Sequence, residues 1–133
     1  MIKDCIKCKN NCCGKIKDIR PVLLPYEEKR LRKYSEIITT PHRKMFALKR
    51  RNGHCIFFDK SSGKCRIYAG RPLECRIYPF LLDFSKRSVD VYLDKRHCKL
   101  KASKTAIQAD MEAIRKIHLS IKWINAYNSM ENF

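Results

Sequence analysis

The chain has 133 residues, with 30 Lys and Arg against 13 Asp and Glu, a formal net charge of +17 and eight cysteines. This length predicts one compact domain over residues 1–133, and no apolar run is long enough to cross a bilayer. The first residues (MIKDCIKCKNN) lack an apolar signal segment. We therefore expect a cytoplasmic protein, in which clustered thiols stay reduced and bind metal or carry redox chemistry rather than form disulfides.

The first elements of the chain are expected to be an extended segment and a helix. Residues 16–24 (IKDIRPVLL) read as extended, since Pro21 opposes a helix there. Pro25 suits the first position of a helix, with acidic residues at 27 and 28 in its positive first turn. A weak apolar stripe carries this helix to about Ser35, and Thr39-Thr40-Pro41 ends it.

From Lys44 the pattern changes to short strands. The segments MFALKR, HCIFFD and KCRIY, with turns at Asn52-Gly53 and Ser61-Ser62-Gly63, predict a small meander. A short helix over PLECRIY ends at Pro79, and FLLDF with SVDVYLD forms a further strand pair.

The last segment is predicted to be one amphipathic helix over about 103–126. Apolar residues recur in it at steps of three and four, which favours a face packed on the core. Thr105 and Gln108 fit a capping box. His118 lies on the same face, so we interpret it as a core or boundary residue rather than a ligand. The predicted fold class is α+β: a small single domain of short antiparallel strands, a cysteine-cluster metal centre and this C-terminal helix.

The N-terminal cysteines have the spacing of chelating residues. In Cys5-x₂-Cys8 a two-residue gap lets both sulfurs reach one ion from a turn. The same spacing can be a dithiol redox pair, but such a pair needs a preceding strand and a following helix. Cys12 and Cys13 are adjacent and their side chains should diverge, so they serve different centres or one of them only packs.

Three further cysteines follow at ten-residue steps, and a last one completes the set of eight. Eight thiols suffice for two four-coordinate centres, or for one centre with spare thiols. His54 and His97 each lie beside a cysteine and are less favoured ligands than the sulfurs. The candidate metal ligands are Cys5, Cys8, Cys12, Cys13, Cys55, Cys65, Cys75 and Cys98.

These motifs carry a family resemblance. C-x₂-C-x₃-C-C followed by C-I-F-F-D-x₃-G-x-C-R-I-Y-x₂-R-P-x₂-C-R-x-Y-P and a later lone cysteine resembles the YkgJ-type cysteine-cluster family, over residues 5–98. Members are described as zinc- or iron-chelating domains and often labelled iron–sulfur-cluster proteins. The matching positions of the second block are Cys55, Phe58, Gly63, Cys65, Tyr68, Arg71, Pro72, Cys75, Arg76, Tyr78 and Pro79.

The resemblance implies an iron–sulfur cluster or zinc, since all-sulfur ligation suits both. We favour a [4Fe–4S]-type cluster, with Cys5, Cys8, Cys12 or Cys13, and Cys75 in one centre. The other thiols would form a second centre or a structural zinc site. Arg66, Arg71 and Arg76 could offset the negative thiolates, or Arg71 and Arg76 could donate to Glu74. Tyr68 and Tyr78 are expected to pack over the centre.

Two other function classes stay open. A zinc-stabilised nucleic-acid binder would use the net charge and the segment KMFALKRR, in which cations flank an aromatic ring. Two four-thiolate centres would lower the charge only to about +13. A cluster-dependent oxidoreductase, or a lysine methylase like the longer flagellin lysine-N-methylase, is the enzymatic alternative. The sequence has no Gly-rich nucleotide loop, no Ser/His/Asp set and no three-cysteine radical signature.

Overall fold

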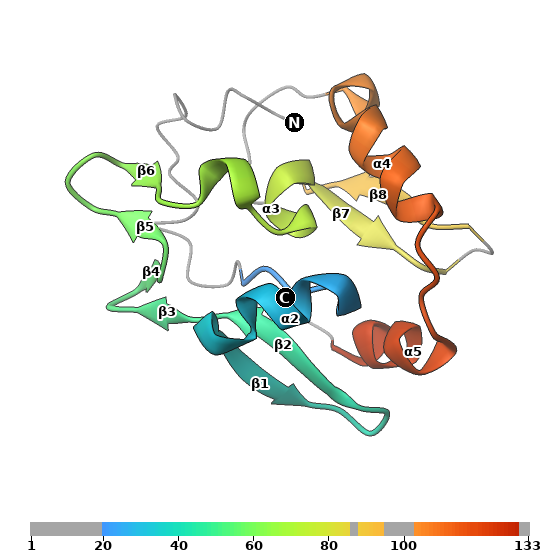
Figure 1. Ribbon diagram of the computed structural model, residues 1–133. Helices are drawn as coiled ribbons and strands as arrows, with labels where there is room; N and C mark the ends of the chain where they lie inside the picture. Colours follow the sequence, from blue (N-terminus) through green and yellow to red (C-terminus); the bar gives the residue numbers. More distant parts are fainter. Residues whose placement is uncertain (1–19, 86–87, 95–102, 131–133) are drawn as a thin grey trace.

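The structure is a computed structural model that describes residues 20–85, 88–94 and 103–130. Helix α2 (Pro25–Leu31) and a 3₁₀ turn, η2 (Arg32–Tyr34), precede the hairpin of β1 (Ser35–Thr39) and β2 (Lys44–Leu48). Two very short hairpins follow, β3 (Arg50–Arg51) with β4 (His54–Cys55) and β5 (Phe58–Asp59) with β6 (Lys64–Cys65). Figure 1 shows these hairpins side by side at one end of the molecule.

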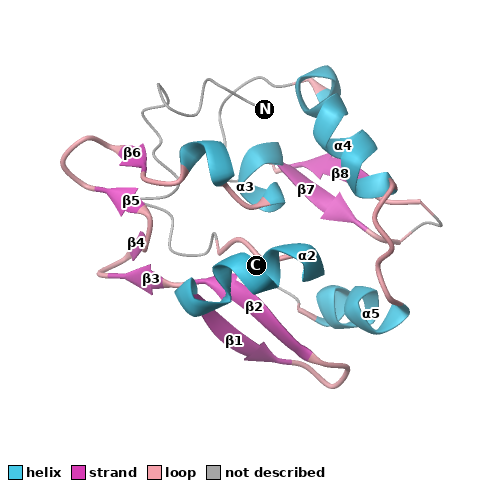
Figure 2. Cartoon of the chain, in the orientation of Figure 1, coloured by secondary structure: helices cyan, strands magenta, loops and turns pink. Residues whose placement is uncertain are grey.

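The second half of the chain adds helices and one more hairpin. A 3₁₀ turn, η3 (Tyr68–Gly70), leads into α3 (Leu73–Ile77), and β7 (Phe80–Asp83) pairs with β8 (Asp90–Leu93). After η4 (Lys104–Ile107) come α4 (Gln108–Arg115) and α5 (Ile121–Ser129). The described residues therefore combine helices with four separate two-stranded antiparallel ladders, which confirms the α+β class (Figure 2).

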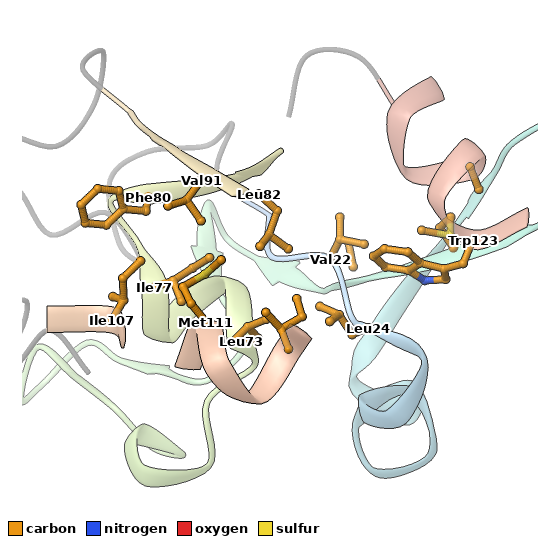
Figure 3. Packing of buried hydrophobic residues seen from close by; sticks show 14 residues of the cluster. Val22, Leu24, Leu73, Ile77, Phe80, Leu82, Val91, Ile107, Met111 and Trp123 are labelled. Carbon is orange, nitrogen blue, oxygen red and sulfur yellow. The ribbon is translucent and has the colours of Figure 1, made fainter. Parts of the chain in front are cut away.

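Two apolar clusters hold these elements. The larger joins Val22 and Leu24 to α3, β7, β8, α4 and α5, and Trp123 lies fully buried at its α5 end (Figure 3). The smaller cluster consists of Leu23, Leu31, Phe46, Leu48 and Phe57. Strand β2 separates the two clusters, because alternate residues of a strand point to opposite faces: Met45 and Ala47 belong to the larger cluster, and Phe46 and Leu48 to the smaller.

The N-terminal half departs from the expectation at one strand. The extended segment is confirmed where it is described, since Leu23 donates to the Phe46 carbonyl at 2.8 Å and flanks β2. The helix from Pro25 is confirmed, but it ends at Leu31 and residues 35–39 form β1, which the sequence analysis missed. Their pairing with β2 decides this conformation, with Ile37 opposite Phe46.

The predicted meander is two hairpins rather than one sheet. HCIFFD does not run straight, because residues 56 and 57 form a turn between β4 and β5. The predicted turn residues are confirmed: Asn52 and Gly53 have φ of 54° and 80°, and Gly63 has φ of 71°. Glycine adopts these positive angles without the steric cost that a β-carbon brings. The short helix, the Tyr78–Pro79 boundary after it and the β7–β8 pair are as predicted.

The predicted single C-terminal helix was wrong. It is broken at residues 116–120 into α4 and α5, and Ser120 caps α5 by accepting a hydrogen bond from the Trp123 amide at 3.1 Å. Thr105 lies inside η4 and caps nothing. His118 is exposed in the break, not packed on the core, and Ile121 is 75% exposed. After the break, Trp123 and Ala126 provide the buried face instead of a continuous stripe.

The buried Glu27 and the half-buried Glu74 join the halves of the fold. Glu27 of α2 accepts from the Leu24 amide at 2.9 Å and from the Leu73 amide, at the start of α3, at 2.7 Å. Glu74 of α3 accepts in return from the Val22 amide at 2.6 Å and from the Tyr127 hydroxyl of α5. Burial raises the pKa of Glu74 to about 7, and the nearby Glu27 carboxylate contributes to that rise while the two hydrogen bonds oppose it.

This carboxylate should make stability depend on pH. Because the folded pKa lies above that of an unfolded glutamate, the contribution is fully present below about pH 4.5 and is lost as pH rises through about 7. We expect the free energy of unfolding to fall by about 3 kcal/mol from this group between pH 5 and pH 9. Glu74→Gln cannot ionise, so its urea-denaturation midpoint should fall less over that range.

The control is Glu112→Gln, at an exposed site on α4, which should retain the wild-type profile. Parallel pH profiles for Glu74→Gln and the wild type would show that this ionisation is not linked to folding.

Candidate metal centre

The three described cysteines lie around one apolar cluster. Cys55 ends β4, Cys65 ends β6 and Cys75 lies in α3, and all three pack half-buried against the smaller cluster. No disulfide joins any two of these three. The other predicted ligands, Cys5, Cys8, Cys12, Cys13 and Cys98, and the less favoured His97, are outside the described residues.

Cys55 and Cys65 occupy equivalent positions in two successive hairpins. Each is the last residue of a short strand and opens a two-residue turn; we call residues 55–57 and 65–67 the cysteine turns. The residue after each cysteine donates its amide to the carbonyl of a preceding segment, Ile56 to Lys49 at 2.9 Å and Arg66 to Phe57 at 2.8 Å. The ten-residue spacing in the sequence is therefore a structural repeat.

In each cysteine turn a backbone amide points at the sulfur. The Cys55 sulfur accepts a hydrogen bond from the Phe57 amide, and the Cys65 sulfur accepts one from the Ile67 amide. Such bonds favour the thiolate, which is the form that ligates metal. The two thiols also interact electrostatically with each other.

Burial works against ionisation of these thiols in the metal-free protein. It raises the pKa of both Cys55 and Cys65, and the amide of each cysteine turn opposes the rise. The interaction between the two sulfurs raises the pKa of Cys55 further, while Arg50 lowers it. A cation that binds both sulfurs would remove this mutual repulsion, so the pair is suited to a metal ion more than to two free thiolates.

Arg71 brings a positive charge to the second cysteine turn. Arg71 is only 6% exposed. Its guanidinium lies 3.9 Å from the centre of the Tyr68 ring, and its Nε donates to the Tyr68 carbonyl at 3.0 Å. It lowers the pKa of Cys65 against the larger effect of burial. Its Nη2 is buried and has no hydrogen-bond partner among residues 20–85, 88–94 and 103–130. A buried charge without an anion is costly, so this nitrogen fits a site that carries negative charge.

The other predicted second-block residues have different roles. Arg76 does not reach Glu74; it pairs with Asp110 of α4 at 3.2 Å. Arg71 does not contact Glu74 through any hydrogen bond either, because the Glu74 oxygens are taken by Val22 and Tyr127. Arg66 is exposed.

The packing of Tyr68 and Tyr78 over a metal centre stays a prediction, and the structure gives each of them other contacts. Tyr78 is buried and donates to Asp94 at 3.0 Å, while Tyr68 packs under the Arg71 guanidinium. Of the candidate histidines, His54 stacks on Phe58 with ring centres 5.3 Å apart.

Among residues 20–85, 88–94 and 103–130, no three His, Cys, Asp or Glu side chains are grouped closely enough to hold one metal ion. The cysteine turns thus offer two thiols and no third ligand beside them among the described residues. Sequence reasoning did not foresee the amide–sulfur bonds or the deep burial of Arg71. The repeated pattern of a cysteine followed two residues later by an apolar residue, Phe57 and Ile67, was the available signal.

The comparisons identify the family. The chain matches the CxxCxxCC family, described as "Putative zinc- or iron-chelating domain", over residues 4–113. It belongs to that family. The match confirms the predicted resemblance and is consistent with the predicted metals, zinc or iron.

One curated relative is an uncharacterized protein of Methanocaldococcus jannaschii, MJ0661, which is 38% identical over 55 residues. That alignment covers 39% of this chain and 30% of the relative. No solved structure matches the chain. The described part of the chain contains no helix long and apolar enough to span a membrane.

The equivalence of the two cysteine turns predicts equal effects of two substitutions. Cys55→Ser and Cys65→Ser should each lower bound metal in the purified protein, because each removes one sulfur whose amide donor is already in place. Metal per chain should be measured by elemental analysis, with Ser62→Ala as control, since Ser62 lies in the same hairpin and bonds only Asp59 and Lys64. Full metal content in either cysteine variant would contradict the assignment of that sulfur as a ligand.

Proposed function

We propose that this protein chelates iron through its cysteines as a [4Fe–4S]-type cluster with a structural or redox role. The observation that carries the proposal is the pair of cysteine turns, which place two thiols half-buried against one apolar cluster, together with a buried guanidinium nitrogen of Arg71 that has no hydrogen-bond partner among the described residues. Hydrogen bonds to the sulfurs are among the features that set the reduction potential of such clusters. The family description supports metal chelation and is compatible with iron.

The proposed ligand sets follow from the cysteine positions. Cys55 and Cys65 are assigned to the same centre, because their thiols interact and their turns are equivalent. Cys75, in α3, is assigned with Cys5, Cys8, and Cys12 or Cys13 to the other. Cys98 and the remaining member of the adjacent pair complete the first set. The reducing cytoplasm is the proposed location, since ligation requires thiols and not disulfides.

Zinc is the alternative metal for one or both centres. Cysteine turns with amide donors suit a four-thiolate zinc site as well as an iron–sulfur cluster, because both place about two negative charges at the sulfurs. In that case the bound ion would contribute folding free energy without redox chemistry.

The absorbance and metal content of anaerobically purified protein distinguish an iron–sulfur cluster from zinc. We expect a brown protein with broad visible charge-transfer absorbance that bleaches on reduction, and with iron and acid-labile sulfide in equal amounts. Cys8→Ser should lose this absorbance and lose solubility, because metal-binding free energy is also folding free energy. A colourless protein with stoichiometric zinc would reject the iron cluster and retain the chelating role.

Arg71 should support metal binding through charge. Arg71→Gln removes the buried cation that lowers the pKa of Cys65, so we expect a loss of about 10–100-fold in zinc affinity, the range typical of groups that support metal ligands. Arg71→Lys, which keeps the charge, should retain more of the affinity. The measurement is competition with a chromogenic chelator after zinc reconstitution.

The matched control is Arg66→Gln, which removes the same charge from an exposed site in the neighbouring cysteine turn. Equal losses in Arg66→Gln and Arg71→Gln would show that net charge, and not the buried guanidinium, governs affinity.

A further inference from the structure

The end of the molecule that carries the cysteine hairpins is strongly basic. Residues 49–66 contain six Lys and Arg and one acidic residue, Asp59. The 3₁₀ turn η2 lies against this segment, because the Lys49 amide donates to the Tyr34 carbonyl at 2.9 Å. We define the hairpin face by its exposed cations: Arg32, Lys33, Lys49, Arg51, Lys60, Lys64 and Arg66.

Most cations of the hairpin face are not neutralised within the protein. The described acidic residues pair elsewhere, as in Glu28 with Arg43 at 2.7 Å and Glu36 with Arg20 at 3.0 Å. Asp59 accepts hydrogen bonds from Ser61 and Ser62 in its own turn, and these bonds, more than the charge of Arg66, lower its pKa. Among the described residues, no ion pair involves Lys33, Lys49, Arg51, Lys60 or Lys64.

The hairpin face offers charge and little apolar surface. Phe46 and Phe57 are 6% and 9% exposed, so neither can stack on a base. The Arg32 guanidinium lies 5.2 Å from the centre of the Phe46 ring, so a cation covers this ring. The large exposed apolar residues of the described chain are Tyr26, Ile37, Tyr92 and Ile121, and none of them lies in residues 49–66. An anionic membrane usually requires apolar insertion besides charge, so a polyphosphate chain fits this face better.

We propose that the hairpin face binds the phosphate backbone of nucleic acid, without sequence preference, beside the proposed metal centre. Lys33, Lys49 and Arg51 are the proposed central contacts, since the Lys49–Tyr34 backbone hydrogen bond joins η2 to the segment between β2 and β3 and all three residues are exposed. Binding of this kind releases counterions from the nucleic acid and therefore weakens steeply with salt. Lys33, Lys49 and Arg51 are neither proposed ligands nor members of the cysteine turns, so binding through them is separable from metal chelation.

The test compares two triple substitutions that remove equal charge. Lys33→Gln/Lys49→Gln/Arg51→Gln acts on the hairpin face, and Arg115→Gln/Lys116→Gln/Lys122→Gln acts on exposed cations of the α4–α5 region, at the other end of the molecule in Figure 1. The probe is a fluorescein-labelled single-stranded 20-mer of mixed sequence, as RNA and as DNA, in anisotropy titrations from about 50 to 200 mM salt.

The wild type should bind both probes with the same steep salt dependence. Since each phosphate contact contributes about 0.7 to the slope of log affinity against log salt for single strands, the hairpin-face variant should lose about 2 from that slope. The α4–α5 variant should keep the wild-type slope, and metal content should be unchanged in both variants. Unchanged metal content keeps this test independent of the chelating role.

Three results would overturn the proposal. They are no binding of either probe by the wild type at low salt, equal losses in the two triple variants, and tighter binding to phosphatidylserine vesicles than to the oligonucleotides. The second would indicate diffuse charge attraction, and the third a membrane surface.

Discussion

The described fold depends on a reciprocal pair of carboxylate–amide contacts. Glu27 of α2 reaches the first amide of α3, and Glu74 of α3 reaches back to the amide of Val22 beside β2. A buried amide or hydroxyl that lost its carboxyl acceptor would be left without a partner, which is costly, so these hydrogen bonds favour the native contact between the two elements. Two segments separated by more than forty residues are thereby held in a fixed position relative to each other.

The candidate site depends on this pairing through α3. Cys75 directly follows Glu74, so the contact that positions the carboxylate also positions that cysteine beside the smaller cluster. The same cluster receives Cys55 and Cys65 from the hairpins. A chain of this size can bury an ordinary core, and here the core supplies the platform on which thiols from separate segments are arranged.

Local backbone conformation could be predicted from the sequence wherever one residue type restricts it. Asn52, Gly53 and Gly63 marked their turns, Pro25 marked a helix start, and the cysteine pattern indicated a chelating family. Contacts between distant segments were not readable. The β1 strand exists because β2 pairs with it, and the break at residues 116–120 lets Trp123 fill the larger cluster.

The charged residues of the site illustrate the same limit. Nothing in the sequence distinguishes Arg71, buried against Tyr68, from the exposed Arg66 five residues earlier. Likewise, Glu74 was an expected partner of nearby arginines, yet it bonds a backbone amide and a tyrosine hydroxyl. Burial decides both cases, and burial is a property of the whole chain.

The two cysteine turns are joined through the backbone of Phe57. Phe57 uses its amide for the sulfur of the first turn and its carbonyl for the amide of Arg66 in the second. One peptide segment thus serves two neighbouring units, and rotating it to suit one would disturb the other. Ordering the first thiol consequently reduces the conformational freedom left to the second, so the two sulfurs are prepared together rather than one by one.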